Sequence, residues 1–366
     1  MTVPASHLDT GLLCPFDLTV DRIGAFANAE IADHPVYEGL ELQWFDDPSH
    51  GTGMLAFLSR RADRRVDYYV GPSLRLDRSG YEIGGGTGLW VETAFDAATL
   101  QVTEEGAVAD VRFQDAEGRT IEVSFDDRDR GRRRPAELLA PFGSDVENPV
   151  SLLLVYMHGF DLLRKGRTPP RILIEGRAAA TGSLPGSFLH RRHLIKAASP
   201  LTVATLCRQR SGPLPPVDVS APGSVRVDDS GGGIAGMTAE DRDASASFTL
   251  DPPLPPLGRL ADGEPALGEW QVDVDGAPLT GGTWHGRRRD TQVDLALDVT
   301  RPWTPPAGLP PVMRVVTRVI PVFRRWPTSY RWTAQVRLDQ TPAAMTSRWE
   351  RTGEGGSESY RRATGS

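Results

Sequence analysis

The residue types best suited to chemistry occur in a short stretch, YMHGFD, at residues 156–161. This stretch places Tyr156, His158 and Asp161 inside the most apolar segment of the chain, VSLLLVYMHGFDLL. Polar groups that enter a core must find partners, and in a concave site they act as acid, base or hydrogen-bond donor. We therefore take His158 and Asp161 as candidate catalytic residues and Tyr156 as a candidate ligand-binding residue. The structural alternative is a histidine on the solvent face of a strand or a hydrogen-bonded core histidine, with Gly159 marking a turn.

A second stretch, GTWHGRRRD at residues 282–290, joins Trp284 and His285 to three arginines. An aromatic ring beside cations suits anionic or sugar-like ligands, through stacking and charge-assisted hydrogen bonds. His285 is the third candidate catalytic residue, and Trp284 is a candidate ligand-binding residue. A hairpin whose tryptophan packs inward while its arginines face water explains the same residues.

A third stretch, FRRWPTSYRW at residues 323–332, is rich in aromatic residues and arginine. Its rings are able to wall an apolar cavity, so Trp326 and Tyr330 are candidate ligand-binding residues. Large buried rings also close the ends of all-β units, and closure of the core is the competing interpretation.

Other stretches resemble known motifs, but the residues around them do not fit the structure that each motif requires. Gly84 and Gly86 fit the start of a dinucleotide fingerprint, but Leu89 occupies its third glycine position and an alternating strand follows instead of a helix. A bend or bulge between strands explains this glycine cluster. His190 and His193 lack a third metal ligand at a suitable spacing. No nucleophile elbow or phosphate-binding loop is present. We therefore expect no metal and no cofactor.

The elements that must position these residues are strands, because apolar and polar residues alternate with a period of two along much of the chain. In ADVRFQDAEGRTIEVSF, at residues 109–125, two alternating runs flank an Asp-Ala-Glu-Gly turn, which predicts a hairpin. Similar runs recur up to YRWTAQVRL, separated by 38 glycines and 30 prolines. Such punctuation is typical of sandwiches and barrels.

Only two short helices are expected, over residues 21–33 and 134–142, the second with Pro135 in its first turn. Asp273–Gly276, D-V-D-G, is expected to be a turn, not a calcium loop. The predicted fold class is therefore all-β: two antiparallel β-barrel or β-sandwich units of lipocalin-like or sandwich type, with few short helices.

The predicted division of the chain follows a change in composition. We expect an N-terminal all-β domain over residues 1–208 and a C-terminal one over residues 245–350. Between them, residues 209–244 contain few large apolar side chains and many turn formers, which predicts a linker or a long loop. Residues 351–366 are expected to be a flexible tail.

Composition limits the class of protein. The net charge is −7, and the arginine clusters are dispersed among acids, which disfavours nucleic-acid binding. Two distant cysteines, Cys14 and Cys207, disfavour a disulfide framework. The N-terminus has no secretory pattern, and the apolar run at residues 150–163 is too short to span a membrane. We expect a soluble cytoplasmic protein.

Three functions stay open from the sequence. The first is binding of a largely apolar small molecule in a barrel or between the two units, with its conversion by acid–base chemistry left undecided. The second is a carbohydrate-binding or carbohydrate-active sandwich that uses Trp284 and Trp326 on an exposed face. The third is a non-catalytic interaction module whose proline-rich loops make the contacts.

Overall fold

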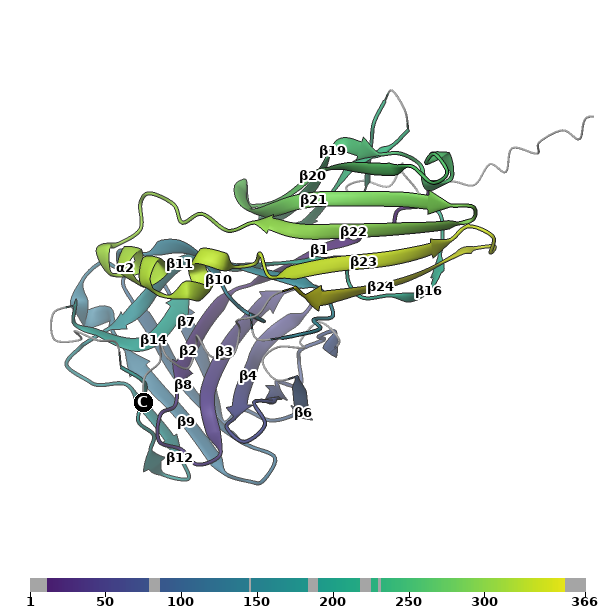
Figure 1. The fold of residues 1–366 in the computed structure, drawn as a ribbon. Helices are drawn as coiled ribbons and strands as arrows, with labels where there is room; N and C mark the ends of the chain where they lie inside the picture. Colours follow the sequence, from purple (N-terminus) through teal and green to yellow (C-terminus); the bar gives the residue numbers. More distant parts are fainter. Residues whose placement is uncertain are drawn as a thin grey trace, which may run out of the picture.

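The computed structural model describes residues 12–78, 86–144, 146–183, 190–217, 225–229 and 232–352. Within them the chain is almost entirely β-strand (Figure 1), with two short α-helices, α2 (Pro311–Val319) and α3 (Pro321–Arg325), and two single 3₁₀ turns, η2 (Arg128–Arg130) and η3 (Leu257–Arg259). The predicted all-β fold with few short helices is confirmed.

The largest sheet has ten strands and belongs to the N-terminal part of the chain. Nine of them follow the order β1-β15-β11-β14-β2-β3-β4-β5-β6, and β10 pairs with β11 beside this path. Neighbouring strands are antiparallel except β5 and β6. In chain order the strands are β1 (Leu18–Ile23), β2 (Ala25–Glu30), β3 (Tyr37–Asp47), β4 (Gly51–Arg60), β5 (Val66–Val70), β6 (Thr87–Glu92), β10 (Ala136–Ala140), β11 (Leu152–Arg164), β14 (Arg192–Ala198) and β15 (Leu201–Leu206).

A five-stranded sheet packs against one face of the ten-stranded sheet (Figure 1). Its order is β13-β12-β9-β8-β7. Its strands are β7 (Ala97–Val102), β8 (Ala107–Gln114), β9 (Thr120–Asp126), β12 (Arg171–Ile174) and β13 (Arg177–Ala178). The predicted hairpin at residues 109–125 is confirmed, since Val111 lies opposite Val123 and Phe113 opposite Ile121. All four side chains are buried between the two sheets.

The C-terminal part of the chain forms one antiparallel sheet of nine strands, in the order β16-β24-β23-β22-β21-β20-β19-β18-β17. Its strands are β16 (Ser211–Leu214), β17 (Val225–Val227), β18 (Ile234–Asp241), β19 (Ala244–Leu254), β20 (Pro265–Val274), β21 (Ala277–Arg289), β22 (Gln292–Arg301), β23 (Tyr330–Arg337) and β24 (Ala343–Arg351). The segment 209–244, which we predicted to be a linker or a long loop, thus supplies β16, β17 and β18. Short strands with few large apolar side chains still pair when neighbouring strands offer free backbone groups.

The central strands of the ten-stranded sheet, β2 to β5, are largely buried on both faces. One face packs on the five-stranded sheet and carries Leu40 and Leu42. The opposite face, which we call the Glu41 face, carries Phe26 and Phe57. Apolar side chains of this face belong to the same buried cluster as the interior of the nine-stranded sheet, including Trp270. A single apolar core is therefore continuous from the N-terminal to the C-terminal strands.

Both helix predictions are wrong. Residues 21–33 form the end of β1 and all of β2, and residues 134–142 contain β10. The alanine-rich sequence of β2 suggested a helix, but Ala25, Ala27 and Ala29 point to one face and Phe26 to the other. Ala25, Phe26, Ala27 and Ala29 are all buried, and pairing of β2 with β14 and β3 overrides the helix propensity of the alanines.

The glycine cluster lies partly outside the described residues, which resume at Gly86. From there the chain continues as β6, as the sequence predicts, and Gly86 has a positive φ of 101°. Gly86 O accepts a hydrogen bond from the Val66 N–H. The strand context excludes a helix N-terminus directly after Gly86.

A buried ion pair ties the five-stranded sheet to the ten-stranded one. The Asp127 carboxylate accepts hydrogen bonds from Arg164 Nε on β11 at 3.0 Å and from the Ala107 N–H on β8 at 2.7 Å. Burial by itself raises the pKa of Asp127, but these hydrogen bonds outweigh it and hold the pKa below its ordinary value. The charged form of Asp127 is therefore part of the folded structure.

We predict that Asp127→Ala lowers the free energy of unfolding by about 3–5 kcal/mol, because it leaves the Arg164 guanidinium buried without its carboxylate. The neighbouring Asp126, which pairs with Arg128 in solvent, is the control, and Asp126→Ala should cost less than about 1 kcal/mol. Urea denaturation of both variants measures the difference. Equal losses would show that the Asp127–Arg164 pair has no special structural role.

Candidate functional site

A row of side chains crosses the Glu41 face at one register. Lys196 of β14 lies opposite Asn28 of β2, and Asn28 lies opposite Glu41 of β3. The row continues to Phe57 of β4 and Tyr68 of β5. Side chains at directly paired positions share one face of a sheet. Residues from five strands, separated by up to 168 positions in the chain, therefore lie side by side.

The row is polar at one end and aromatic at the other. The Phe57 and Tyr68 rings have centroids 4.9 Å apart in an edge-on arrangement. Tyr68 also stacks on Trp90 of β6 with centroids 4.8 Å apart. We call Asn28, Glu41, Gln43 and Lys196 the Glu41 cluster. It adjoins an aromatic wall, an arrangement that suits a molecule with an apolar body and one polar group.

Glu41 is the most deeply buried member of the cluster, with 4% of its surface exposed. Gln43 Nε2 donates a hydrogen bond to its Oε1 at 2.7 Å, and Asn28 Nδ2 donates one to its Oε2 at 3.3 Å. Burial raises the pKa of Glu41 to about 7, although these two hydrogen bonds and the charge of Lys196 act in the opposite direction. A carboxyl group with this pKa is able to donate or accept a proton at neutral pH.

Gln43 leaves one acceptor free beside this carboxyl group. Its side-chain Oε1 is buried, and among the described residues it has no hydrogen-bond partner. A buried polar atom without a partner costs free energy, so such atoms in native structures call for an explanation. A donor group on a bound molecule would satisfy Gln43 Oε1 next to Glu41.

Lys196 marks the side of the cluster that is nearest to solvent. Its Nζ donates hydrogen bonds to Asn28 Oδ1 and Glu30 Oε1, both at 3.3 Å. The side chains of Lys196 and Glu30 are 29% and 31% exposed, respectively. The polar row therefore runs from partly hydrated charges at Lys196 to the buried carboxyl group of Glu41.

The structure places His158 at a contact between the N-terminal and C-terminal strands. His158 Nε2 lies 2.7 Å from Oδ2 of Asp275, a residue of the turn that joins β20 to β21. The same Oδ2 accepts a hydrogen bond from the Thr202 hydroxyl at 2.6 Å, and Oδ1 accepts one from the Ser245 N–H at 2.7 Å. The turn expected at Asp273–Gly276 thus also supplies the carboxylate partner of the candidate histidine.

Tyr156 lies beside His158, with ring centroids 4.9 Å apart in an edge-on arrangement. Its hydroxyl donates a hydrogen bond to Glu137 Oε2 at 2.7 Å. Burial, followed by this carboxylate, raises the pKa of Tyr156 well above its ordinary value. Tyr156–Glu137 and His158–Asp275 are therefore two hydrogen-bonded pairs, which meet through the contact of the Tyr156 and His158 rings and through His158 Nδ1, 3.9 Å from Glu137 Oε1. Asp161 has other partners.

Asp161 is buried on β11 and lies 3.4 Å from Arg192 Nη2. Burial raises its pKa, although Arg192 and Arg133 act in the opposite direction. Gly159, which we expected to mark a turn, lies inside β11 with a positive φ of 57°. It sits where β11 changes its partner from β15 to β14. This change separates the partners of His158 from those of Asp161.

The candidates on the nine-stranded sheet lie apart from each other. His285 has a half-exposed side chain on β21, with Nε2 3.5 Å from Asp298 Oδ2. Trp284 points the other way into the core, where it shares one row with Trp332 and Trp349. Only 2% of Trp284 is exposed, so its ring forms no surface platform.

Trp326 and Tyr330 face a segment of the N-terminal part. They line a cavity of about 20 Å³ together with Phe142 and Leu153, among others. This volume is close to the size of one water molecule. The Tyr330 hydroxyl donates to the carbonyl of Gly143 at 2.7 Å. These contacts close the end of the core, and the predicted roles of Trp326 and Tyr330 in binding a ligand stay predictions.

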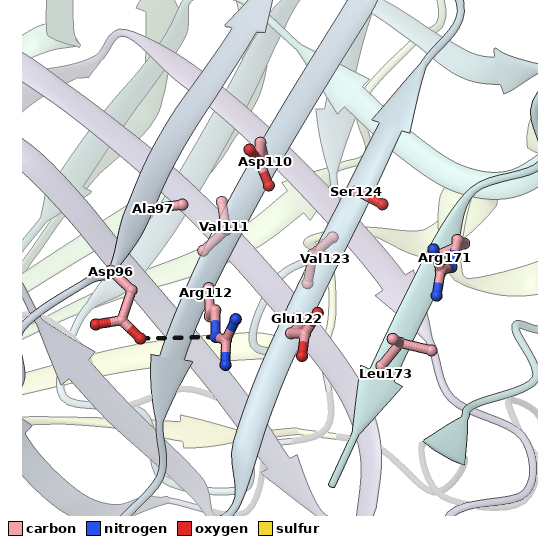
Figure 2. Close-up of a pocket in the computed structure, with 10 residues that line it drawn as sticks. All are labelled: Asp96, Ala97, Asp110, Val111, Arg112, Glu122, Val123, Ser124, Arg171 and Leu173. Atoms are coloured by element: carbon pink, nitrogen blue, oxygen red, sulfur yellow. Dashed lines mark ion pairs between the residues drawn. The ribbon is translucent and has the colours of Figure 1, made fainter. Parts of the chain in front are cut away.

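A groove of about 360 Å³ lies on the outer face of the five-stranded sheet (Figure 2). Figure 2 shows that charged side chains of both signs line it. Arg112 Nε lies 3.6 Å from Asp96 Oδ2 in an ion pair. The lining residues are Asp96, Ala97, Asp110, Val111, Arg112, Glu122, Val123, Ser124, Arg171 and Leu173. A hydrated groove of this kind does not match an apolar molecule.

Sequence reasoning missed Glu41 and Gln43. In the run LELQWF they alternate with Leu40, Leu42 and Trp44, which is the pattern of a strand with one hydrated face. The available signal was Phe45, which continues the polar face with a large apolar residue. That single residue was insufficient to show that the face is buried.

Within the described residues, no group of three or more histidine, cysteine, aspartate and glutamate side chains is arranged to hold a metal ion. The described helices also include none with the length and apolar character needed to cross a membrane. Comparison of the chain with protein-family models, curated proteins and solved structures finds no match. The geometry described above therefore carries the functional argument alone.

We predict that Glu41 makes the protein less stable as the pH rises. Its folded-state pKa is raised, so its contribution is complete below the unfolded pKa and is lost as the pH passes through about 7. Between about pH 5 and pH 8, the wild type should lose about 2–3 kcal/mol relative to Glu41→Gln. Denaturant unfolding at both pH values measures this, with Glu30→Gln as the partly exposed control. Parallel curves for the wild type and Glu41→Gln would contradict the prediction.

The contact of His158 with Asp275 yields a second prediction. His158→Ala removes one of the three donors to the Asp275 carboxylate and should lower the free energy of unfolding by about 1–3 kcal/mol. His285→Ala, at a half-exposed position, should change it by less than about 0.5 kcal/mol. Thermal and urea denaturation give both values. An unchanged stability of His158→Ala would instead leave this histidine available for the catalytic role predicted from the sequence.

Proposed function

We propose that the protein binds a largely apolar small molecule at the Glu41 face and that Glu41 exchanges a proton with it. The observation that carries this proposal is a buried carboxyl group, with a pKa raised to about 7, beside an unpartnered buried acceptor and an aromatic wall. Perturbed titratable groups of this kind gather at functional sites.

Each part of the site has a separate role in this proposal. The aromatic wall, including Phe57 and Tyr68, contacts the apolar body of the molecule. Gln43 Oε1 accepts a hydrogen bond from its polar group, and Glu41 takes or returns the proton. Lys196 keeps a positive charge near the carboxylate and stabilises its ionised form.

The proposal also includes the mode of ligand binding and the cellular compartment. The ligand would lie against the inner surface of curved sheets, as in lipocalin-type barrels. The proposed compartment is the cytoplasm, with support from Cys14 and Cys207, which are both free and buried. The proposal needs no nucleic acid and no cofactor.

The carbohydrate hypothesis receives less support than this proposal. It requires exposed rings on a flat face, whereas Trp284 and Trp326 are both buried. Among the described residues, the large apolar side chains that are most exposed include no aromatic ring. The interaction-module hypothesis accounts for neither the raised pKa of Glu41 nor the free acceptor of Gln43.

A proton-transfer probe tests the proposal directly. Nitrobenzisoxazole is a flat apolar molecule from which a base removes one C–H proton while the N–O bond breaks, giving a cyanophenolate. We expect wild-type protein to accelerate this reaction, with a rate that rises with pH through about 7, because the carboxylate is the reactive form. Glu41→Gln should lower the rate at least about 10²-fold.

The controls separate binding from chemistry. Glu30→Gln should keep the wild-type rate, since Glu30 lies outside the row, two residues along β2 from Asn28, with a side chain that is 31% exposed. Native mass spectrometry of gently purified protein should show a retained small molecule in the wild type. Probe turnover that is the same in wild type and Glu41→Gln, together with a protein mass free of any ligand, would refute the proposal.

A further inference from the structure

Helix α2 presents large apolar side chains to solvent. Val315 and Val319 lie one turn apart and are 60% and 66% exposed. Met313 and Thr317, also one turn apart, are buried on the opposite side. Because residues four apart share one helix face, the helix has one face in the core and a second apolar strip pointing outward. Among the described residues, only two other large apolar side chains are similarly exposed, and both are leucines on strands.

The strip belongs to a positively charged stretch of the sequence, although the chain carries a net charge of −7. Residues 299–338 contain no aspartate or glutamate, and their basic residues are Arg301, Arg314, Arg318, Arg324, Arg325, Arg331 and Arg337. Arg314 and Arg318 are exposed on α2, and Arg324 and Arg325 are exposed on α3. In the described part of the chain, none of these last four arginines forms an ion pair, whereas Arg331 lies 3.4 Å from Asp298.

The two helices hold these side chains on one short, anchored segment. In Figure 1, α2 lies at one end of the nine-stranded sheet, beyond the strands, and α3 follows it directly. The Ile320 N–H donates to the Val316 carbonyl at the end of α2, and the Trp326 N–H donates to the Val322 carbonyl at the end of α3. Trp326 is buried and fixes the far end of the segment.

We propose that this segment binds the surface of an anionic phospholipid bilayer. We call Arg314, Val315, Arg318, Val319, Arg324 and Arg325 the α2 surface. A helix that lies in the headgroup region of a bilayer needs apolar side chains flanked by basic ones. Here the valines would lie at the boundary with the acyl chains, and the guanidinium groups would contact the lipid phosphates. Nine helical residues give weak, reversible binding that does not span the bilayer.

Charge favours a bilayer over a second copy of the chain. A symmetric dimer through this surface would place the same arginines against each other, with no acid within residues 299–338 to offset them. An anionic bilayer offers a dense array of phosphates that compensates all four free guanidinium groups. This proposal stands apart from the role of Glu41, because it concerns a different surface.

Vesicle cosedimentation of the full chain tests the proposal. We expect binding to vesicles of phosphatidylcholine and phosphatidylglycerol, weaker binding at high salt, and little binding to phosphatidylcholine alone. Val315→Asp/Val319→Asp should abolish binding. Arg314→Gln/Arg318→Gln should lower the affinity roughly fivefold for each arginine removed.

Matched variants elsewhere control for charge and hydropathy. Leu267→Asp changes a leucine that is 62% exposed on β20, and Arg112→Gln/Arg171→Gln removes two charges from the outer face of the five-stranded sheet. Both controls should bind like wild type, and circular dichroism melts show whether each variant is folded. Binding by the α2 variants equal to wild type, or no wild-type binding to anionic vesicles, would overturn the proposal. A wild-type dimer that Val315→Asp/Val319→Asp converts into a monomer, seen by analytical ultracentrifugation, would also overturn it.

Discussion

Burial of the central strands of the ten-stranded sheet on both faces is the constraint on which the rest of the structure depends. A sheet with one hydrated face places its polar side chains in water at no cost, but here both faces are covered over β2 to β5. Every polar side chain on the Glu41 face must then find a partner within the protein or remain without one. Asn28, Glu41 and Lys196 meet this condition through one another, whereas Gln43 meets it only with its amide nitrogen. The raised pKa of Glu41 follows from the same burial, so the unusual chemistry of this face is a product of the architecture.

Much of the architecture could be predicted from the sequence, because a period of two is a local property of the chain. The hairpin of β8 and β9 is readable from Val111, Phe113 and their partners without any knowledge of the fold. The same rule failed for β2, where three alanines alternate with Phe26, Asn28 and Glu30, because alanine has a high helix propensity and the expected element was therefore a helix. Within residues 209–244, predicted to be a linker or a long loop, the strands β16, β17 and β18 escaped this rule for a related reason, since strands held mainly by backbone pairing need few large apolar residues. Local sequence patterns therefore predict strands best where one face of the sheet is exposed to solvent.

The candidate site was less accessible, because its members meet through register and not through spacing. Glu41 and Gln43 resemble residues of a hydrated strand face until the position of Lys196, on a strand far along the chain, is known. The D-V-D-G turn was recognised as a turn, yet no local pattern shows that Asp275 reaches back 117 residues to His158. The aromatic residues Trp284, Trp326 and Tyr330 were visible in the sequence, but whether such rings line a cavity or fill a core depends on neighbours from other strands.

The cross-strand row has an evolutionary consequence for the gene. Deleting or inserting a single residue within β3 would move every following side chain of the strand to the opposite face of the sheet. Glu41 and Gln43 would then take the places of Leu40 and Leu42, and the carboxylate would face the five-stranded sheet. A change of length in the turn between β3 and β4, at residues 48–50, leaves the alternation of side chains within β3 unchanged. Insertions and deletions in descendants of this chain should therefore occur mainly in connections such as this turn. The number of residues between Asn28 and Glu41 should change only in ways that keep both side chains on the Glu41 face.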